Sequence, residues 1–321
     1  MDKLKIRFFS DAYKPKRASH RLRGEVTCQA LADQGYDAKI LTNDWSEVDA
    51  NTIVIFLKRS QVHSMQRAKD LGAKTIYDLC DNKFEEKEEY EPCCQLADLV
   101  SVNSENMGIS VKHHTGRDYV VMPDPYERPI LKPKFNPNSQ LELLWFGSQS
   151  SFAFLPIVEV WQRLEQDIID YRYSMISSKT DRVLSKMKKR QDKGSVTGIN
   201  LDKINLEIWT WERQGQLLES CDIVLMPVQT ENPRTDTKSA NRLIDSLISG
   251  RFVITTPLHS YLDFEPFTWQ GDYIEGIKWA RANPEKVLEM ITAGQHYVEE
   301  NYSARVLSKR FIEEVKHQLG M

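Results

Sequence analysis

The chain has 321 residues, of which 40% are hydrophobic and 28% are charged, and its formal net charge is −3. This length suits two domains that each bury a core, and the lack of a basic excess argues against a dedicated nucleic-acid binder. The apolar runs are too short to cross a bilayer, the N-terminus resembles no signal peptide, and the five cysteines are scattered without a disulfide pattern. We therefore expect a cytoplasmic, globular protein.

Short apolar segments alternate with amphipathic ones through the first half, which is typical of α/β units around a parallel sheet. We predict strands at residues 5–10, 37–41, 53–57, 73–78, 99–103 and 119–122. Helices are expected between them, notably at 21–34, 62–71 and 104–112. Residues 123–138 contain five prolines and no periodic pattern, so we interpret them as a linker.

The same pattern restarts after the linker. We predict strands at residues 141–146, 171–176, 206–209, 223–226 and 252–255. The expected helices include 155–166, 214–220, 240–249 and a final one at 303–319. The sequence thus predicts two α/β domains, residues 1–130 and residues 131–321, with closing helices at the C-terminus.

Polar clusters follow several predicted strands, where open parallel sheets bind their ligands. They occupy residues 10–23, 78–82, 147–151, 209–212 and 227–236. Two such domains facing each other would form a cleft lined by these clusters.

The segment 238–257 consists of a basic polar loop, a short helix that ends at Gly250, and an apolar strand. A helix N-terminus favours an anion through its free N–H groups and its dipole. Lys238 and Arg242 are four residues apart, so on one helical turn they would face the same way. Asp245 follows one turn later and could accept hydrogen bonds from sugar hydroxyls. The pattern suits a nucleotide site; the alternative is an ordinary helix with solvated charges.

This layout resembles glycosyltransferases of the GT-B fold, of the retaining group 1 or family 4 type, over nearly the whole chain. The resemblance rests on segments 143–148, 220–227 and 238–257 in the second half and on 18–24 and 97–104 in the first. It implies two Rossmann-like domains facing each other across a cleft, an acceptor-side domain first and a donor-binding domain second, and a C-terminal helix that crosses back to the first domain.

The resemblance also implies roles for residues of the second half. A carboxylate on the donor helix usually binds ribose, and Asp245 is the matching position. Many members have two glutamates eight positions apart where this chain has Thr237 and Asp245. Many also have basic residues after the first donor-domain strand, which the turn 147–151 lacks, so Lys238 and Arg242 would have to hold the diphosphate. The expected donor contacts are Gly147, Ser148, Gln149, Trp209, Trp211, Lys238, Ser239, Asn241, Arg242 and Asp245.

Glycosyl transfer needs stabilisation of the negative charge that develops on the leaving diphosphate. We expect Lys238 and Arg242 to supply it as catalytic cations. No Asp-x-Asp pair occurs in the chain, so we expect no required divalent ion. Trp209 and Trp211 could stack on the nucleotide base; the alternative is that they pack in the core.

The first half carries the expected acceptor-side residues, namely Ser19, His20, Arg21, Arg23 and Asp78. Asp81 is the candidate general base. An inverting enzyme would need such a base, whereas in a retaining one the leaving phosphate can serve, and the resemblance favours retention. The alternatives are a solvated basic helix start and a structural turn.

Two further clusters have structural alternatives. The basic segment 179–193 could be attracted to an anionic membrane surface or simply form an exposed helix. Cysteines 80, 93 and 94 with histidines 113 and 114 lack the paired spacing of a metal site, so we expect them to pack in the protein.

The sequence therefore predicts a cytoplasmic glycosyltransferase, with peripheral membrane contact as an option. It would move a sugar from a UDP-, GDP- or dTDP-sugar to a hydroxyl of a glycan or lipid-linked glycan. The alternatives are a nucleotide-sugar epimerase of the same fold and a non-catalytic binding protein with a degenerate site.

Overall fold

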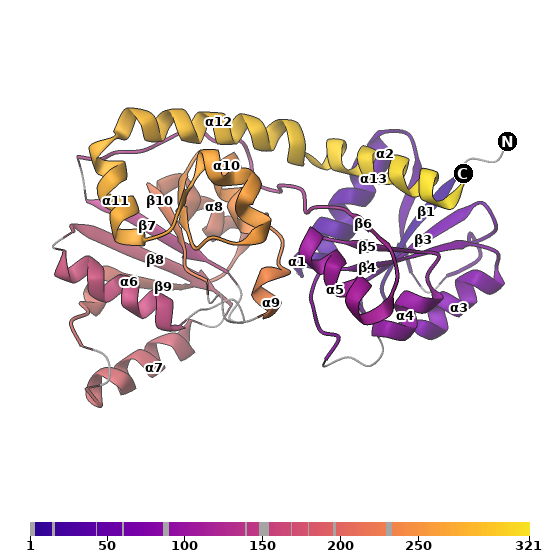
Figure 1. Cartoon of the computed structure of the whole chain (residues 1–321), viewed down its shortest axis with the longest axis horizontal. Helices are drawn as coiled ribbons and strands as arrows, with labels where there is room; N and C mark the ends of the chain where they lie inside the picture. The colour runs from indigo at the N-terminus through magenta and orange to yellow at the C-terminus, as the bar shows by residue number, and fades with distance from the viewer. Residues whose placement is uncertain are drawn as a thin grey trace. The chain divides into compact units, whose positions relative to one another are not determined.

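The structure is a computed structural model with two compact units (Figure 1). It describes residues 4–14, 17–42, 44–59, 61–85, 90–138, 140–147, 154–167, 169–178, 180–194, 197–228 and 233–321. Unit 1 contains residues 1–127, 236–241 and 300–321, and unit 2 contains residues 128–235 and 242–299. The main division lies close to the expected boundary at residue 130. The segment 236–241 and the end of the chain, however, group with unit 1.

Within the described residues, unit 1 has a parallel six-stranded sheet in the order β2-β1-β3-β4-β5-β6. Its strands are β1 (Lys5–Phe9), β2 (Asp37–Leu41), β3 (Thr52–Leu57), β4 (Lys74–Leu79), β5 (Leu99–Val102) and β6 (Tyr119–Val121). Its helices are α1 (Ala18–His20), the π-helix η1 (Arg21–Val26), α2 (Thr27–Asp33), α3 (Val62–Asp70), α4 (Tyr90–Leu96), α5 (Glu105–Thr115) and α13 (Ala304–Leu319). The central strand β3 is buried along its whole length, as its unbroken apolar sequence predicts.

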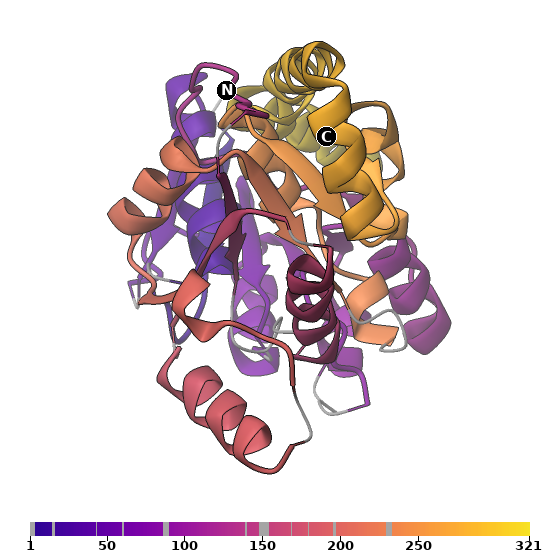
Figure 2. The same cartoon turned by 90° about the vertical axis from the view of Figure 1, so that its left-hand side faces the viewer.

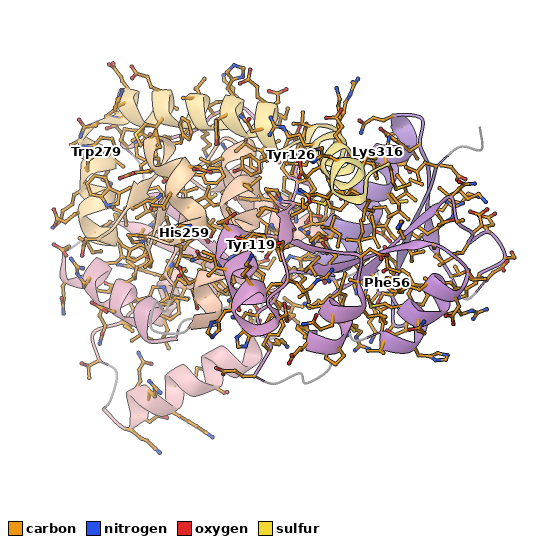
Figure 3. The ribbon with its side chains drawn as sticks, turned by 45° about the vertical axis from the view of Figure 1, so that its right-hand side comes forward. Phe56, Tyr119, Tyr126, His259, Trp279 and Lys316 are labelled. Carbon is orange, nitrogen blue, oxygen red and sulfur yellow. The ribbon has the colours of Figure 1, made fainter. Side chains whose placement is uncertain are left out.

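Helix α13 belongs to unit 1 because its apolar face lies in that unit's core. Phe311, Ile312 and Val315 are buried together with Ile6 and Ile55 of the sheet. Each such side chain contributes about 1.5–3 kcal/mol on burial. Figure 3 labels Lys316 on this helix; its ammonium lies 4.8 Å from the ring centre of Tyr36. The last helix thus joins the first domain, as the resemblance implied, although the expected domain limits had placed it in the second.

The described part of unit 2 also contains a parallel six-stranded sheet, in the order β12-β11-β10-β7-β8-β9. Its strands are β7 (Leu141–Phe146), β8 (Tyr171–Ser177), β9 (Ile204–Ile208), β10 (Ile223–Met226), β11 (Phe252–Thr255) and β12 (Trp269–Gln270). The helical segments after β6 and before α13 are α6 (Phe154–Gln166), α7 (Asp181–Asp192), η3 (Leu201–Lys203), α8 (Trp211–Ser220), α9 (Pro233–Asp236), α10 (Asn241–Ile248), η4 (His259–Phe267), α11 (Tyr273–Ala282) and α12 (Pro284–Tyr302). The two-residue strand β12 was not predicted.

Two local features agree with the sequence analysis. Every residue of 123–138 is described, and none lies in a helix or strand, as expected of a linker. Helix α10 is followed by Gly250, whose φ of 66° suits a glycine. A Cβ at Gly250 would lie 2.9 Å from the backbone nitrogen of Pro133, so the close approach also requires glycine.

Helix α7 stands apart from the sheet of unit 2 in Figure 2, and its residues 188–190 are exposed.

Candidate functional sites

The strand orders define one expected binding position in each unit. In unit 1 the order reverses between β1 and β3, and in unit 2 it reverses between β7 and β10. Ligands of open α/β sheets bind outside the carboxyl ends of the strands at such switch points. We therefore describe the residues at these two positions, each within its own unit.

In unit 2, Arg242 extends from the first turn of α10 to the carboxyl end of β7. Its Nη1 donates a hydrogen bond to the carbonyl oxygen of Phe146 at 3.2 Å. A Cβ added at Gly147 would lie 3.2 Å from the same nitrogen. The structure thus places the Arg242 guanidinium beside Gly147, and its contact with a diphosphate stays a prediction.

Lys238 does not share a helical turn with Arg242, so that expectation is wrong. Helix α10 begins at Asn241, and Lys238 lies before it in an irregular segment of unit 1. The helix itself was expected at 240–249, one residue from its observed start, so the error concerns only the placement of Lys238 on a helical turn.

The segment 236–241 is held in unit 1 by its own hydrogen bonds. The hydroxyl of Ser104 donates to the carbonyl oxygen of Thr237 at 3.0 Å, and the hydroxyl of Ser239 donates to Asp124 at 2.5 Å. These bonds hold residues 237 and 239 outside α10, which is the physical reason why Lys238 does not share a helical turn with Arg242.

Asp245, the expected ribose partner, lies one turn after Arg242 but is only 7% exposed. Asn241, another expected donor contact, is half-buried at the start of the same helix. Their contacts with a donor stay predictions. Ser148 and Gln149 lie outside the described residues.

A hydroxyl pair near Arg242 escaped the sequence analysis. Tyr273 donates to the carbonyl oxygen of Met226 at 3.1 Å, and the hydroxyl of Thr256 lies 2.5 Å from that of Tyr273. Burial is the main cause that raises the pKa of Tyr273, while the positive charge of Arg242 acts in the opposite direction. The phenol therefore stays protonated and links the ends of β10 and β11. The sequence offered one signal for this pair: Thr256 directly follows a strand, and Tyr273 begins a helix.

The two candidate base-stacking tryptophans differ. The guanidinium of Arg128 lies 3.6 Å from the ring centre of Trp211 and donates to the Trp211 carbonyl at 2.8 Å, so this ring is engaged in a cation–π contact. Trp209 follows β9 and is half-buried, and its Nε1 donates to Gln214 at 2.6 Å. Because Arg128 already contacts the ring of Trp211, Trp209 is our preferred candidate for the base, and the contact stays a prediction.

In unit 1, His20 is completely buried at the end of α1. Its Nδ1 accepts a hydrogen bond from the backbone N–H of Lys14 at 2.8 Å, so its proton resides on Nε2. The ring stacks on Tyr13 at 5.0 Å. Burial lowers the pKa of His20 to about 4, and the charges of Arg17 and Lys58 act in the same direction. His20 is therefore a neutral hydrogen-bond donor at physiological pH.

Arg23 and Asp78 form a buried ion pair. Arg23 donates to Asp78 at 2.5 and 2.6 Å and to Asp124 at 3.1 Å, and Ser101 also donates to Asp78. Both members of the pair are 2% exposed. Burial alone would lower the pKa of Arg23, but the two carboxylates hold it above its usual value. This geometry favours a structural role for Arg23 and Asp78 over direct contact with an acceptor.

The other acceptor-side residues lie nearer the surface. Arg21 donates to Glu127 at 2.5 and 2.6 Å, and Ser19 is half-buried on α1. Asp81, the candidate base, follows β4 and forms an ion pair with Lys58. No described geometry identifies Asp81 as a base, and that role stays a prediction.

Cys93 and Cys94 are buried in the core of unit 1, and His114 stacks on Phe84 at 4.7 Å. Among the described residues, no group of three or more histidine, cysteine or acidic side chains is placed to hold a metal ion. None of the described helices is long and apolar enough to span a membrane.

Neither a protein-family model nor a curated protein sequence matches this chain. Solved structures do. HepE of Anabaena, in complex with UDP and glucose, has 11% identity and a TM-score of 0.68, with 98% of this chain and 99% of HepE covered. A glycosyltransferase of Rickettsia africae has 14% identity and a TM-score of 0.68, with 99% of both chains covered.

A mutant of S. aureus TarM, in complex with fondaparinux, α-GlcNAc-glycerol and UDP, has 14% identity and a TM-score of 0.63. The match covers 83% of this chain but only 56% of TarM, so the chain spans little more than half of that protein's length. Because all of these identities are low, the structural matches establish the fold alone. The chain has the fold of the GT-B glycosyltransferases, with two Rossmann-like domains.

Proposed function

We propose that this protein is a glycosyltransferase that moves a sugar from a nucleotide-sugar donor to a hydroxyl of a glycan or related acceptor. One observation carries the proposal: the guanidinium of Arg242 lies beside Gly147 at the carboxyl end of β7, at the switch point of unit 2. A delocalised cation at a helix start, next to a glycine that has no side chain, suits a diphosphate.

Arg242 would bind the diphosphate and stabilise the charge that develops on it as the glycosidic bond to the donor breaks. Trp209 would contact the base, and Asp245 the ribose. The solved structures of HepE and TarM contain UDP, which supports a uridine donor. The absence of an Asp-x-Asp motif favours transfer without a divalent ion. The likeness of the donor segment to retaining enzymes favours retention, for which the leaving phosphate can act as the base.

The test is binding of UDP, GDP and dTDP and of their sugars, measured by calorimetry and thermal shift. We expect one nucleotide to bind and Arg242→Gln to weaken it by about 10- to 100-fold, the equivalent of one charged hydrogen-bonded contact. Arg172→Gln is the matched control, because Arg172 is an exposed arginine near the amino end of β8 in the same unit. No binding of any nucleotide, or equal affinities for both variants and the unaltered chain, would contradict the proposal.

The same samples separate an enzyme from a binding protein. A glycosyltransferase should release nucleotide diphosphate slowly from its donor even without an acceptor, because water can replace the hydroxyl. Arg242→Gln should abolish this release. Interconversion of the donor sugar without release would instead identify an epimerase.

A further inference from the structure

The switch point of unit 1 contains buried polar atoms that the described protein does not satisfy. Ser10 follows β1 and is 6% exposed, and His20 is 0% exposed. The hydroxyl of Ser10 and the Nε2 of His20 have no hydrogen-bond partner among the described residues. Buried polar groups usually have partners, so both atoms are available to a ligand or to bound solvent. Similar atoms occur elsewhere among the described residues, and these two gain weight from the backbone and the charges around them.

The backbone at the end of β3 is strained. Lys58 has a φ of 62° and is the described non-glycine residue with a positive φ. The N–H of Arg59 donates to the carbonyl oxygen of Leu57 at 2.7 Å, which closes a γ-turn around Lys58. γ-turns with positive φ are rare and strained. Backbone strain of this kind concentrates at functional sites, where it aims a side chain.

The helix that enters this edge is also irregular. The expected helix 21–34 is divided into the π-helix η1 and α2. Gly24 lies inside η1, where a Cβ would lie 3.0 Å from the Leu57 side chain, so the helix approaches the end of β3 closely. Single π-helical turns occur frequently at functional sites.

Cations predominate around His20. Arg17, Lys58 and Arg59 all act on its ring electrostatically, and Asp11 is the carboxylate that opposes them. Lys58 is balanced in part by its ion pair with Asp81. The side chain of Arg59 is exposed, and those of Arg17 and Lys58 are half-buried.

We propose that this edge of unit 1 binds a phosphate or diphosphate group carried by the acceptor. Lys58 and Arg59 supply positive charge, while His20 Nε2 and the Ser10 hydroxyl supply neutral donors. A phosphate has enough oxygens to accept all of these hydrogen bonds at once. The assignment to the acceptor rests on the proposed function, because unit 2 has its own switch point for the donor.

The probe is inorganic pyrophosphate, titrated by calorimetry into the Arg242→Gln variant so that the donor site does not contribute. We expect saturable binding to this variant. Adding Arg59→Gln to Arg242→Gln should weaken the binding of pyrophosphate about tenfold, because a charged contact is lost. Lys58→Gly should weaken binding to a similar extent. The control is Lys39→Gln, which removes a half-exposed cation from β2 of the same unit and should leave the affinity unchanged.

Nuclear magnetic resonance of the unaltered chain provides a second measurement. Pyrophosphate should shift the His20 Nε2–H signal, and saturating UDP should not prevent the shift. Loss of all pyrophosphate binding in Arg242→Gln, or equal affinities for the Arg59 and Lys39 variants, would overturn the proposal. Competition with UDP would assign the anion to the donor and overturn the acceptor assignment. If no nucleotide binds, but the Lys58 and Arg59 substitutions still lower the affinity for pyrophosphate, the proposed function fails and the anion site stands.

Discussion

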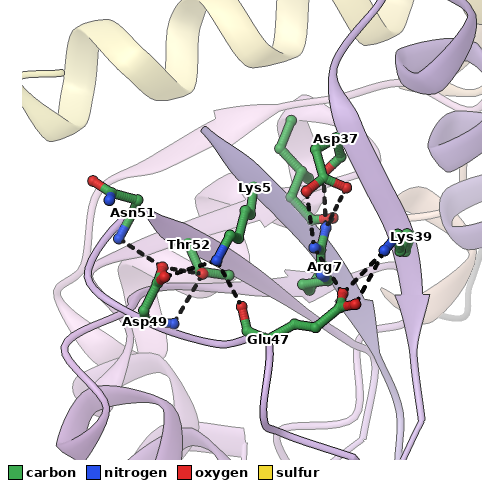
Figure 4. Close-up of polar contacts among 9 residues, drawn as sticks. Lys5, Arg7, Asp37, Lys39, Glu47, Asp49, Asn51 and Thr52 are labelled. Carbon is green, nitrogen blue, oxygen red and sulfur yellow. Dashed lines mark hydrogen bonds and ion pairs between the residues drawn. The ribbon is translucent and has the colours of Figure 1, made fainter. Parts of the chain in front are cut away.

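The amino ends and the carboxyl ends of the strands in unit 1, which we call its amino edge and its carboxyl edge, both carry charged residues, but these residues have different roles. At the amino edge, the guanidinium of Arg7 is 1% exposed and lies 3.1 Å from Asp37 and 3.0 Å from Glu47, while Lys5 lies 2.7 Å from Asp49 (Figure 4). This network joins β1 to β2 and to the loop before β3, so its charges stabilise the fold.

At the carboxyl edge, charges that lie below the surface are paired, as in Arg23 with Asp78. Those nearer the surface, among them Lys58 and Arg59, act on the ring of His20, whose buried Nε2 has no described partner. The backbone is regular at the first edge and strained at Lys58 at the second. A buried atom without a described partner also occurs at the amino edge, the Nε of Arg7, so such atoms do not by themselves separate the two edges. The difference teaches that a charged cluster indicates a ligand when backbone strain accompanies it, and not by its charges alone. Four predictions test this comparison.

Asp78→Asn should give the largest effect. It removes one charge of a buried pair and leaves the Arg23 guanidinium 2% exposed with Asp124 as its remaining described carboxylate. Breaking such a pair costs about 3–5 kcal/mol of unfolding free energy. Urea denaturation would measure it. A cost below about 1 kcal/mol would contradict the structural role that we assign to this pair.

Arg7→Met should destabilise the amino edge by about 2–3 kcal/mol, the range for charged hydrogen bonds. The cost is smaller than for Asp78 because Asp37 and Glu47 are 31% and 51% exposed and can be hydrated. Pyrophosphate affinity should not change. A change in affinity would break the distinction between the two edges.

His20 should make stability depend on pH between about 4 and 6.5. Its pKa is lower in the folded chain than in the unfolded one, so the unfolded chain binds more protons and stability falls as the pH drops through this range. The slope from this group is at most about 1.4 kcal/mol per pH unit. Pyrophosphate should reduce the slope, since a bound anion favours the protonated ring. His20→Gln, if it folds, should remove the same component.

Lys58→Gly and Lys58→Ala should separate strain from charge. Both remove the ammonium, but only glycine adopts a positive φ without strain, so the glycine variant should be more stable than the alanine variant by about 1 kcal/mol. Thermal denaturation of both variants would measure the difference. Equal stabilities would show that the turn at Lys58 stores no strain.

Particular residues show how far the sequence reaches. Apolar runs such as 52–57 predict buried strands because a strand covered on both faces needs apolar side chains throughout. The glycine at 250 predicts the end of α10 because only glycine adopts its backbone conformation freely. The spacing of Lys238 and Arg242 was misleading, since bonds from Ser104 and to Asp124, more than a hundred residues away, hold the neighbours of Lys238 outside the helix.

The sequence by itself determined the α/β class, most of the strands and the polar clusters at their ends, because these follow from short-range periodicity. Only the tertiary structure decided the order of the strands, and with it the two switch points. It also placed α13 in unit 1 through the burial of Phe311, Ile312 and Val315, and it brought Arg242 to Gly147. These outcomes depend on pairing and packing between segments distant in the chain, which local patterns of residues do not encode.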